Sequence, residues 1–293
     1  MFDGIKVIRD ARMSEYTTLK LGGPADYLAF PTDRVQTAQL LAEAMEAGIP
    51  VTVIGRGSNL LVRDGGIRGL VIRIGKEMSR IRIEGNTIRA QAGAMLGTVA
   101  AAAAEAGLTG LEFASGIPGN LGGGVYMNAG AYEESLSGIV TRAEGLRPDG
   151  TVFSYTGDEM KFGYRTSRAA EENLIVTDAE LTLQPGNRDM IRAKMQELNR
   201  RRADKQPLNV PSAGSTFKRP EGHFAGALIE QCGLKGYRIG GAEVSTKHAG
   251  FLVNQGESAE DFLSLIRYVQ KTVEERTGVK LETEVRIIGE ERI

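Results

Sequence analysis

One glycine-rich segment constrains this chain more than any other feature of its sequence. Residues 116–123 hold four glycines and a proline, directly after an apolar segment. Because glycine lacks a Cβ atom, such a segment can adopt positive φ and bring bare N–H groups close to a ligand. The geometry favours a phosphate or a flat ring, although glycine-rich runs also form simple tight turns. A second loop of the same kind favours the ligand interpretation.

The second loop covers residues 55–59, with the sequence Gly-Arg-Gly-Ser-Asn. Apolar runs flank it on both sides, so the pattern predicts a strand, an anion-binding turn and another strand. Successive N–H groups in such a turn form a nest for oxyanions, with Arg56, Ser58 and Asn59 as further donors. The spacing matches neither GxxxxGK(S/T) nor a GxGxxG that opens a helix. The simplest use for the two loops is a dinucleotide held by both.

Length and charge narrow the class of protein. A chain of 293 residues is long enough for roughly two domains, or three small ones. With Lys+Arg 36 against Asp+Glu 37, the net charge of -1 gives no global attraction to nucleic acid or a membrane surface. The one dense basic cluster, three arginines at residues 200–202, ends an expected helix. We interpret it as a solvated helix face.

Cysteine and histidine usage limits metal and disulfide chemistry. The single cysteine, Cys232, excludes an internal disulfide, and only two histidines, His223 and His248, argue against a zinc site. No metal is expected, and both histidines are interpreted as structural. The first ten residues lack the apolar core of a signal peptide, and no run approaches the ~18 apolar residues of a membrane span. We therefore expect a cytoplasmic protein.

Helix and strand patterns are mixed along the whole chain, which indicates an α+β or α/β fold. Helices are predicted at residues 33–47 after a Thr32 cap, at 96–106, and at 258–277 between a Ser258 cap and Gly278. Hairpins are predicted at residues 81–90 and around 148–150, with a buried strand at 174–176. Pro and Gly residues after position 203 predict a boundary there.

Three further clusters carry possible chemistry. In residues 162–167, the guanidinium of Arg165 beside Tyr164 is suited to bidentate binding of a carboxylate or phosphate. The same sequence is equally compatible with an Arg-Tyr pair on the surface. Ser215 follows Gly214 and precedes two cations. It lacks the GxSxG context and base of a serine nucleophile, but a proton donor needs neither. Residues 281–288 alternate as a strand with a polar face, and taken alone this face is interpreted as solvated.

Five ordered motifs together resemble the UDP-N-acetylenolpyruvoylglucosamine reductase family. They are GRGSNLLV at residues 55–62, ASGIPGNLGGGVYMNAGA at 114–131, FGYRTS at 162–167, AGSTFKRP at 213–220 and LETEVRIIG at 281–289. The resemblance extends from about Thr18 to the C-terminus. It implies an α+β protein with a two-lobed FAD-binding fold of the vanillyl-alcohol-oxidase type and a smaller α/β substrate-binding domain. The expected lobes are residues 1–75 and 76–203, the substrate domain is 204–283, and the final strand at about 284–293 is able to return to the first lobe.

The resemblance also implies where the cofactor binds. FAD would be held without a covalent link, because neither loop contains a His or Cys. The pyrophosphate would contact the first loop, and the ring and ribityl chain would contact the second. The implied cofactor residues are Gly55, Arg56, Gly57, Ser58, Asn59, Ser115, Gly116, Ile117, Pro118, Gly119, Gly122 and Gly123.

The activity implied by the family is reduction of UDP-N-acetylglucosamine enolpyruvate to UDP-N-acetylmuramate in peptidoglycan precursor synthesis. NADPH would reduce FAD, and hydride would pass from FAD N5 to the vinyl carbon. Arg165 would stabilise the developing charge, Glu284 would assist by hydrogen bonding, and Ser215 would protonate the carbon beside the carboxylate. The implied substrate-binding residues are Tyr164, Lys218 and Arg219, with the arginines at 200–202 as weaker candidates.

Two departures from the family pattern are visible. Arg219 stands where many relatives have asparagine, and the chain lacks the tyrosine-bearing insertion of some relatives, so it resembles the shorter subtype. The expected partners are the UDP-sugar and NADPH, with no nucleic acid, membrane or obligate protein partner. Two other interpretations stay open at this point. One is an FAD-dependent sugar or hydroxy-acid oxidase, and the other is a non-flavin serine hydrolase or nucleotide-binding regulator.

Overall fold

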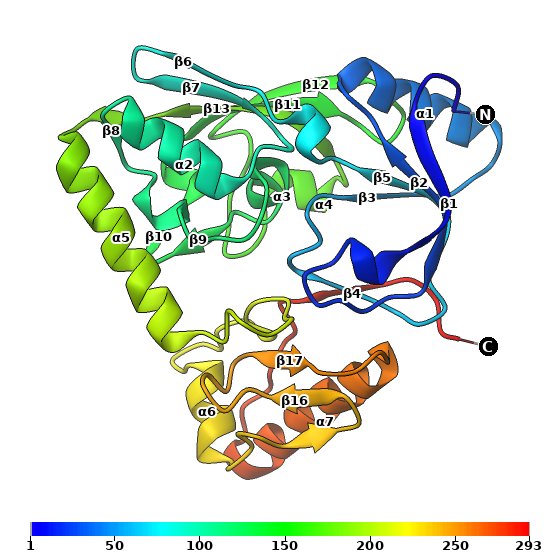
Figure 1. Cartoon of the computed structure of the whole chain (residues 1–293), viewed down its shortest axis with the longest axis vertical. Coiled ribbons are helices and arrows are strands. Elements are labelled where there is room, and N and C mark those ends of the chain that lie inside the picture. Colours follow the sequence, from blue (N-terminus) through cyan, green and yellow to red (C-terminus); the bar gives the residue numbers. More distant parts are fainter. Residues whose placement is uncertain (1, 293) are drawn as a thin grey trace. The chain divides into compact units, whose positions relative to one another are not determined.

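The computed structural model describes residues 2–292, which form two compact units (Figure 1). The first unit contains the N-terminal residues up to Ile8, Tyr27–Arg56 and Gly69–Arg202. The second contains Arg9–Asp26, Gly57–Arg68 and the chain from Ala203 onward. Each unit has a hydrophobic core of its own. Both units mix strands and helices, which confirms the α+β class.

The elements have the following bounds. The α-helices are α1 Arg34–Glu46, α2 Leu96–Glu105, α3 Leu121–Tyr126, α4 Arg168–Glu171, α5 Arg188–Lys205, α6 Ala225–Gln231 and α7 Ala259–Thr277. Short 3-10 helices cover Met13–Glu15, Lys76–Met78, Glu112–Ala114 and Leu136–Gly138. The strands are β1 Lys6–Arg12, β2 Pro24–Phe30, β3 Val51–Ile54, β4 Leu60–Val62, β5 Ile67–Arg73, β6 Ile81–Glu84, β7 Thr87–Gln91, β8 Leu108–Thr109, β9 Gly130–Ala131, β10 Glu134–Ser135, β11 Val140–Leu146, β12 Val152–Thr156, β13 Ile175–Thr182, β14 Gln184–Pro185, β15 Arg238–Ile239, β16 Ala242–Val244, β17 Leu252–Asn254 and β18 Arg286–Ile288.

A five-stranded antiparallel sheet organises the first unit, in the order β12-β11-β13-β7-β6. Helices α2 and α3 lie along one side of this sheet (Figure 1), and their apolar residues share its core. Side chains alternate between the two faces of a strand. Accordingly, Ile88 and Leu181 are fully buried. Arg89, which lies between the buried residues Ile88 and Ala90 of β7, is exposed. A second sheet has the order β1-β2-β5-β3, and its strands β3 and β5 are parallel.

Most expected elements of the first unit are confirmed by the structure. Helix α2 and the hairpins β6-β7 and β11-β12 lie where the sequence predicts them. The predicted cap of α1 is wrong by one residue, since Asp33 rather than Thr32 accepts the Gln36 N–H, at 2.8 Å. Asp33 has the extended backbone of an N-cap, and its carboxylate satisfies a first-turn donor. Across residues 2–292, no helix combines the length and apolar character needed to cross a bilayer.

In the second unit, helices α6 and α7 share a core with the antiparallel sheet β15-β16-β17. The sequence prediction for α7 is confirmed: Ser258 caps its start, and Gly278 ends it at φ 73°. The predicted apolar face is buried, including Phe262, Ile266 and Val269. Burying each such side chain stabilises the fold by about 1.5–3 kcal/mol. Local periodicity and two terminal residues therefore determine this helix.

The predicted strand at residues 281–288 is only partly correct. Regular strand structure covers Arg286–Ile288, which pair in parallel with Leu60–Val62 of β4. Residues 282–284 instead bond to the chain at 216–218 through an antiparallel bridge between Phe217 and Thr283. The segment changes partner midway, so its two faces do not keep one alternation. Ile287, which the period of two places in the core, is 36% exposed.

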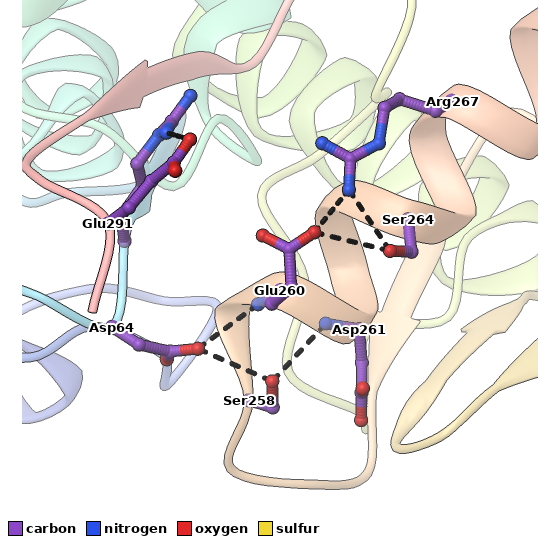
Figure 2. A network of polar contacts seen from close by, with 8 residues as sticks. Asp64, Ser258, Glu260, Asp261, Ser264, Arg267 and Glu291 are labelled. Atoms are coloured by element: carbon purple, nitrogen blue, oxygen red, sulfur yellow. Dashed lines mark hydrogen bonds and ion pairs between the residues drawn. The ribbon is translucent and has the colours of Figure 1, made fainter. Parts of the chain in front are cut away.

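The start of α7 is also held by a residue distant in sequence. Asp64, just after β4, accepts the N–H groups of Ala259 at 2.8 Å and Glu260 at 3.2 Å. Figure 2 shows its carboxylate beside Ser258, whose hydroxyl donates to it and also accepts the Asp261 N–H, at 3.2 Å. A carboxylate at this position satisfies donors that the helix leaves unpaired and interacts favourably with the helix dipole. The β4 loop and α7 are thereby fixed to one another.

We expect Asp64→Ala to lower the free energy of unfolding by about 1–2 kcal/mol, because it leaves those two N–H groups without their acceptor. Urea unfolding followed by circular dichroism measures this change. Glu257→Ala is the matched control, since Glu257 is an exposed carboxylate one residue from the same cap. Equal stability of the two variants would contradict a capping role for Asp64.

Candidate active site

The two glycine loops of the sequence meet through one buried side chain, Asn120. Its Oδ1 accepts the Arg56 N–H at 2.7 Å, and its Nδ2 donates to the Ile74 carbonyl at 2.8 Å. Asn120 is 4% exposed. A Cβ atom on Gly55 would lie 2.9 Å from Asn120 Oδ1, so this close approach requires glycine. The amide thus fixes the start of the first loop against the second.

The second loop lies directly on the end of strand β7. The N–H groups of Leu121 and Gly122 donate to the carbonyls of Ala94 and Ala92, each at 2.8 Å. A Cβ atom on Gly122 would lie 2.6 Å from the Ala92 Cβ atom, whereas one on Gly123 would meet nothing within 4 Å. Gly122 is therefore needed for packing. At Gly123, by contrast, the space that a side chain would occupy is open.

The first residues of the second loop contact helix α5. The Ser115 hydroxyl is 3.3 Å from Asn199 Oδ1, and a Cβ atom on Gly116 would lie 2.6 Å from that same oxygen and 3.0 Å from the Arg202 Cδ atom. Arg202 Nε is buried and has no hydrogen-bond partner within the described chain. Burial also lowers the pKa of Arg202. A buried donor of this kind needs an acceptor, so this end of the loop suits a ligand with acceptor atoms.

The remainder of the first loop is anchored inside the second unit. Gly57 has φ +72°, and its Cβ position lies 2.4 Å from the Tyr16 carbonyl oxygen, so only glycine fits. Its own carbonyl accepts the Thr18 N–H at 3.2 Å. Asn59 Nδ2 donates to the Glu284 carbonyl at 3.0 Å. The Asn59 amide, expected to donate to a ligand, thus makes a bond within the chain.

Arg165 occupies a tight, conformationally costly turn. Gly163 and Thr166 pair across it, and Arg165 has φ 56°, a region that a residue with a Cβ atom adopts only at a cost. Its guanidinium donates to the Gly130 carbonyl at 3.2 Å and lies 5.4 Å from the Tyr164 ring centroid. The Tyr164 side chain is 58% exposed. Strain of this kind persists where the surroundings hold it in place.

A second buried asparagine holds the Arg165 turn. Asn128 Nδ2 donates to the Gly163 carbonyl at 2.9 Å, and its Oδ1 accepts the Ser137 N–H at 3.0 Å. The hydroxyl of the buried Ser167 donates to the Tyr126 carbonyl at 2.7 Å. The chain just after α3 therefore positions the arginine. Sequence reasoning missed both Asn120 and Asn128, and the signal for each was a polar residue inside an otherwise apolar or glycine-rich run.

Ser215 and Glu284 belong to two paired segments. The Glu284 N–H donates to the Thr216 carbonyl at 2.8 Å, next to the bridge between Phe217 and Thr283. The Ser215 hydroxyl donates to the Phe217 carbonyl at 3.1 Å, in a turn where Gly214 has φ +78°. Glu284 is thus held on one side by Thr216 and on the other by Asn59. The backbones that carry the proton-donor candidate and the glutamate are adjacent.

The expected substrate-binding cations lie in the same region. Lys218 Nζ is 3.1 Å from Glu282 Oε2; the Lys218 side chain is half-exposed and that of Glu282 is largely exposed. The Arg219 guanidinium lies over the Phe224 ring, 4.1 Å from its centroid. Ser215, Glu284, Lys218 and Arg219 belong to one compact unit, while Tyr164 and Arg165 belong to the other.

The expected minor residues have structural contacts. Of the three arginines at 200–202, Arg201 pairs with Glu197 at 3.6 Å and lies over the Tyr132 ring. His248 Nδ1 accepts the Gly250 N–H at 3.1 Å, and burial lowers the pKa of this imidazole. Because protonation would remove that acceptor, the neutral form is the one this contact needs.

The loops and the comparisons with known proteins define the class of protein. A model of the FAD binding domain matches residues 25–156. The structure of a glucooligosaccharide oxidase from Acremonium strictum, 14% identical in sequence, covers 95% of this chain and 57% of the oxidase chain. Its TM-score of 0.50 shows a similar fold. The chain is an FAD-binding oxidoreductase of the vanillyl-alcohol-oxidase fold type, with a further C-terminal domain.

That C-terminal domain and the full-length relatives identify the family. A model described as the C-terminal domain of UDP-N-acetylenolpyruvoylglucosamine reductase matches residues 206–288. The reductase of that name from Levilactobacillus brevis is 52% identical over 291 residues, 99% of this chain and 95% of the relative. UDP-N-acetylenolpyruvylglucosamine reductase from Thermus caldophilus, known from a crystal structure, is 36% identical in sequence. The match covers 97% of this chain and 99% of the Thermus chain, with a TM-score of 0.84. The chain belongs to the UDP-N-acetylenolpyruvoylglucosamine reductase family.

Proposed function

We infer that this chain reduces UDP-N-acetylglucosamine enolpyruvate to UDP-N-acetylmuramate, with NADPH as reductant and FAD as cofactor, in peptidoglycan precursor synthesis. Family membership over nearly the whole chain carries this conclusion. It also favours the reductase over the oxidase and hydrolase alternatives that the sequence left open. The residue-level roles below are proposals that the local geometry supports.

The residues of the glycine loops fit FAD. The N–H groups and side chains of Gly55 to Asn59 would bind the pyrophosphate, and Ser115 to Gly119 with Gly122 and Gly123 would contact the ring and ribityl chain. Three observations support this: Asn120 joins the loops, Gly123 is open on one side, and Arg202 Nε is a buried donor beside Gly116. The chemistry that FAD supplies when bound is two-electron hydride transfer between NADPH and the enolpyruvyl group.

The chain's own residues would control the charge and the proton. Hydride addition to the vinyl carbon places negative charge on the neighbouring carboxylate, and we propose that Arg165 stabilises that charge. Glu284 would assist by hydrogen bonding, and Ser215 would donate the proton that completes the lactyl ether. Tyr164, Lys218 and Arg219 would position the substrate. The support is local: Arg165 is held in a strained turn, and the segments of Ser215 and Glu284 are paired.

We further propose the domain division as lobes at residues 1–75 and 76–203, a substrate domain at 204–283, and a last strand at about 284–293 that returns to the first lobe. The parallel pairing of β18 with β4 supports the last point. We also propose that the protein acts in the cytoplasm on its UDP-sugar and NADPH, without obligate protein partners. The near-neutral charge supports the absence of a nucleic-acid or membrane partner.

Anaerobic addition of NADPH to the purified protein tests the function. We expect a yellow protein whose flavin absorbance bleaches, and whose oxidised spectrum returns when UDP-N-acetylglucosamine enolpyruvate is added. UDP-N-acetylglucosamine is the matched control, because it has the same nucleotide and sugar without the enolpyruvyl group. Reoxidation by oxygen together with sugar turnover, but none by the enolpyruvyl compound, would instead support an oxidase.

A further inference from the structure

A charged pocket lies on the outer face of the five-stranded sheet in the first unit. Its volume is about 430 Å³, and five arginines and three carboxylates line it. The lining residues come from β6 and Arg80 just before it, from β7, β11 and β13, and from the start of α1. The core residues Ile88, Ala143 and Leu181 alternate along these strands with the residues of the pocket, and helices α2 and α3 pack with those core residues. The pocket is therefore on the face opposite α2 and α3.

The strand register arranges the charges in rows across this face. In the first row, Arg82 of β6 is directly opposite Arg89 of β7, which is opposite Glu180 of β13. Glu180 is in turn opposite Arg142 of β11. The only carboxylate of this row, Glu180, pairs with Arg89 at 3.0 Å. One carboxylate among three guanidinium groups leaves the row with a net positive charge.

A second row, two residues further along each strand, holds both remaining carboxylates and is balanced by two arginines. It begins at Arg80, just before β6, whose backbone carbonyl accepts the Gln91 N–H at 2.9 Å. Gln91 of β7 is opposite Asp178 of β13, and Asp178 is opposite Glu144 of β11. Arg34, at the start of α1, reaches Glu144 at 3.5 Å. A row of net positive charge and a balanced row that contains two carboxylates therefore lie side by side within one pocket.

Each row contains directly opposed like charges, a pairing that destabilises a sheet. Arg82 opposes Arg89, and Asp178 opposes Glu144. A solvated face that served only the fold would gain stability by alternating these charges across the strands. The observed order concentrates positive charge in the first row and places two carboxylates next to each other in the second, and a ligand with both an anionic group and hydrogen-bond donors complements it.

The chemistry of the two rows defines that ligand. Guanidinium forks match the oxygens of a phosphate, and several of them suit a dianion. Ionised carboxylates only accept hydrogen bonds, so the groups that face Asp178 and Glu144 must be donors, such as hydroxyls. Among the described residues that line the pocket there is no aromatic side chain on which a nucleobase could stack. The volume is in the range of small-ligand pockets, roughly 300–1,000 Å³.

We propose that this pocket binds a phosphorylated sugar, with its phosphate on Arg82, Arg89 and Arg142 and its hydroxyl groups on Asp178 and Glu144. The ligand class is distinct from the UDP-sugar substrate, because the pocket offers no site for a base. Binding would not require any of the residues assigned to the reductase reaction.

Isothermal titration of the flavin-loaded protein with glucose 6-phosphate tests the proposal, with inorganic phosphate and glucose as separate titrants. We expect one glucose 6-phosphate per chain, weaker binding of inorganic phosphate, and no detectable binding of glucose. Arg89→Gln should weaken the sugar phosphate at least about tenfold, because a charge-assisted pair of hydrogen bonds is lost. Asp178→Asn should weaken glucose 6-phosphate while leaving inorganic phosphate unchanged.

Arg238→Gln is the matched control, since Arg238 is an exposed arginine of the other unit that also pairs with a carboxylate, Glu243. This variant should bind glucose 6-phosphate as the unchanged protein does. No binding, or binding that Arg89→Gln leaves unaltered, would overturn the proposal. Equal affinity for inorganic phosphate and glucose 6-phosphate would overturn it as well, because Asp178 and Glu144 would then contribute nothing to binding.

Discussion

Replacing Ser215 with alanine is expected to leave flavin binding and reduction by NADPH intact while slowing product formation by roughly 10²–10⁴-fold, the usual range for a lost general acid. The hydroxyl is bonded to the Phe217 carbonyl at 3.1 Å, within a turn that glycine and the Thr283 bridge hold in place. Removing one oxygen atom from this turn leaves those backbone bonds intact. The defect should therefore appear in the proton transfer and spare the fold.

An aliphatic hydroxyl is a weak acid, so its surroundings must stabilise the alkoxide that forms. Lys218 is the nearby cation of the same segment, and its present partner is Glu282 at 3.1 Å. Exposed ion pairs contribute little free energy, about 0–1 kcal/mol, so the ammonium can exchange Glu282 for another anion at small cost. A substrate that binds beside Ser215 therefore gains a cation without a large loss elsewhere.

Stopped-flow absorbance separates the two half-reactions of the Ser215→Ala variant. Flavin reduction by NADPH should keep its rate, while reoxidation by the enolpyruvyl substrate should be slow. Ser212→Ala, three residues earlier in the same segment, is the matched control and should behave as the unchanged protein. Reoxidation of Ser215→Ala at the normal rate would assign the proton to another donor.

The sequence predicted those parts of the fold that depend on neighbouring residues. Helix α7 follows from an apolar period, a serine cap and a terminal glycine, all within about twenty residues of one another. The glycine loops were likewise predicted from composition and from the strands beside them. Their joint use by one ligand was a hypothesis, and the bond between Arg56 and Asn120 supports it.

Features that depend on distant residues were not predictable. Asn120 bonds to Ile74 and Arg56, which precede it by 46 and 64 positions, and nothing in its neighbourhood in the sequence indicates those partners. Asp64 reaches the start of α7 across 195 positions. Apolar and polar residues alternate regularly along residues 281–288, yet the first part of this segment pairs with Phe217 and the last part with β4. Strand pairing is decided by the tertiary structure rather than by the local pattern.

Arg165→Gln is expected to lower kcat by about 10²–10³-fold, the effect of removing one group that stabilises transition-state charge. The substitution keeps a long polar side chain and removes the positive charge and the planar pair of N–H donors of the guanidinium. The turn itself should persist, because the bonds of Asn128 and Ser167 that hold it do not involve the Arg165 side chain. Arg165→Lys should recover only part of the loss, since an ammonium keeps the charge and lacks the planar pair of donors.

Lys161→Gln is the matched control for this change. Lys161 is an exposed cation four residues earlier, and it too has a positive φ, 46°, so the control removes a charge from a similarly strained position. Steady-state kinetics with the enolpyruvyl substrate should give a normal kcat for Lys161→Gln and a reduced one for Arg165→Gln. If Arg165→Gln raised KM alone, the arginine would contribute equally to ground state and transition state, and its role would be substrate binding. Loss of kcat in both variants would mean that the strained loop, rather than the guanidinium, sets the rate.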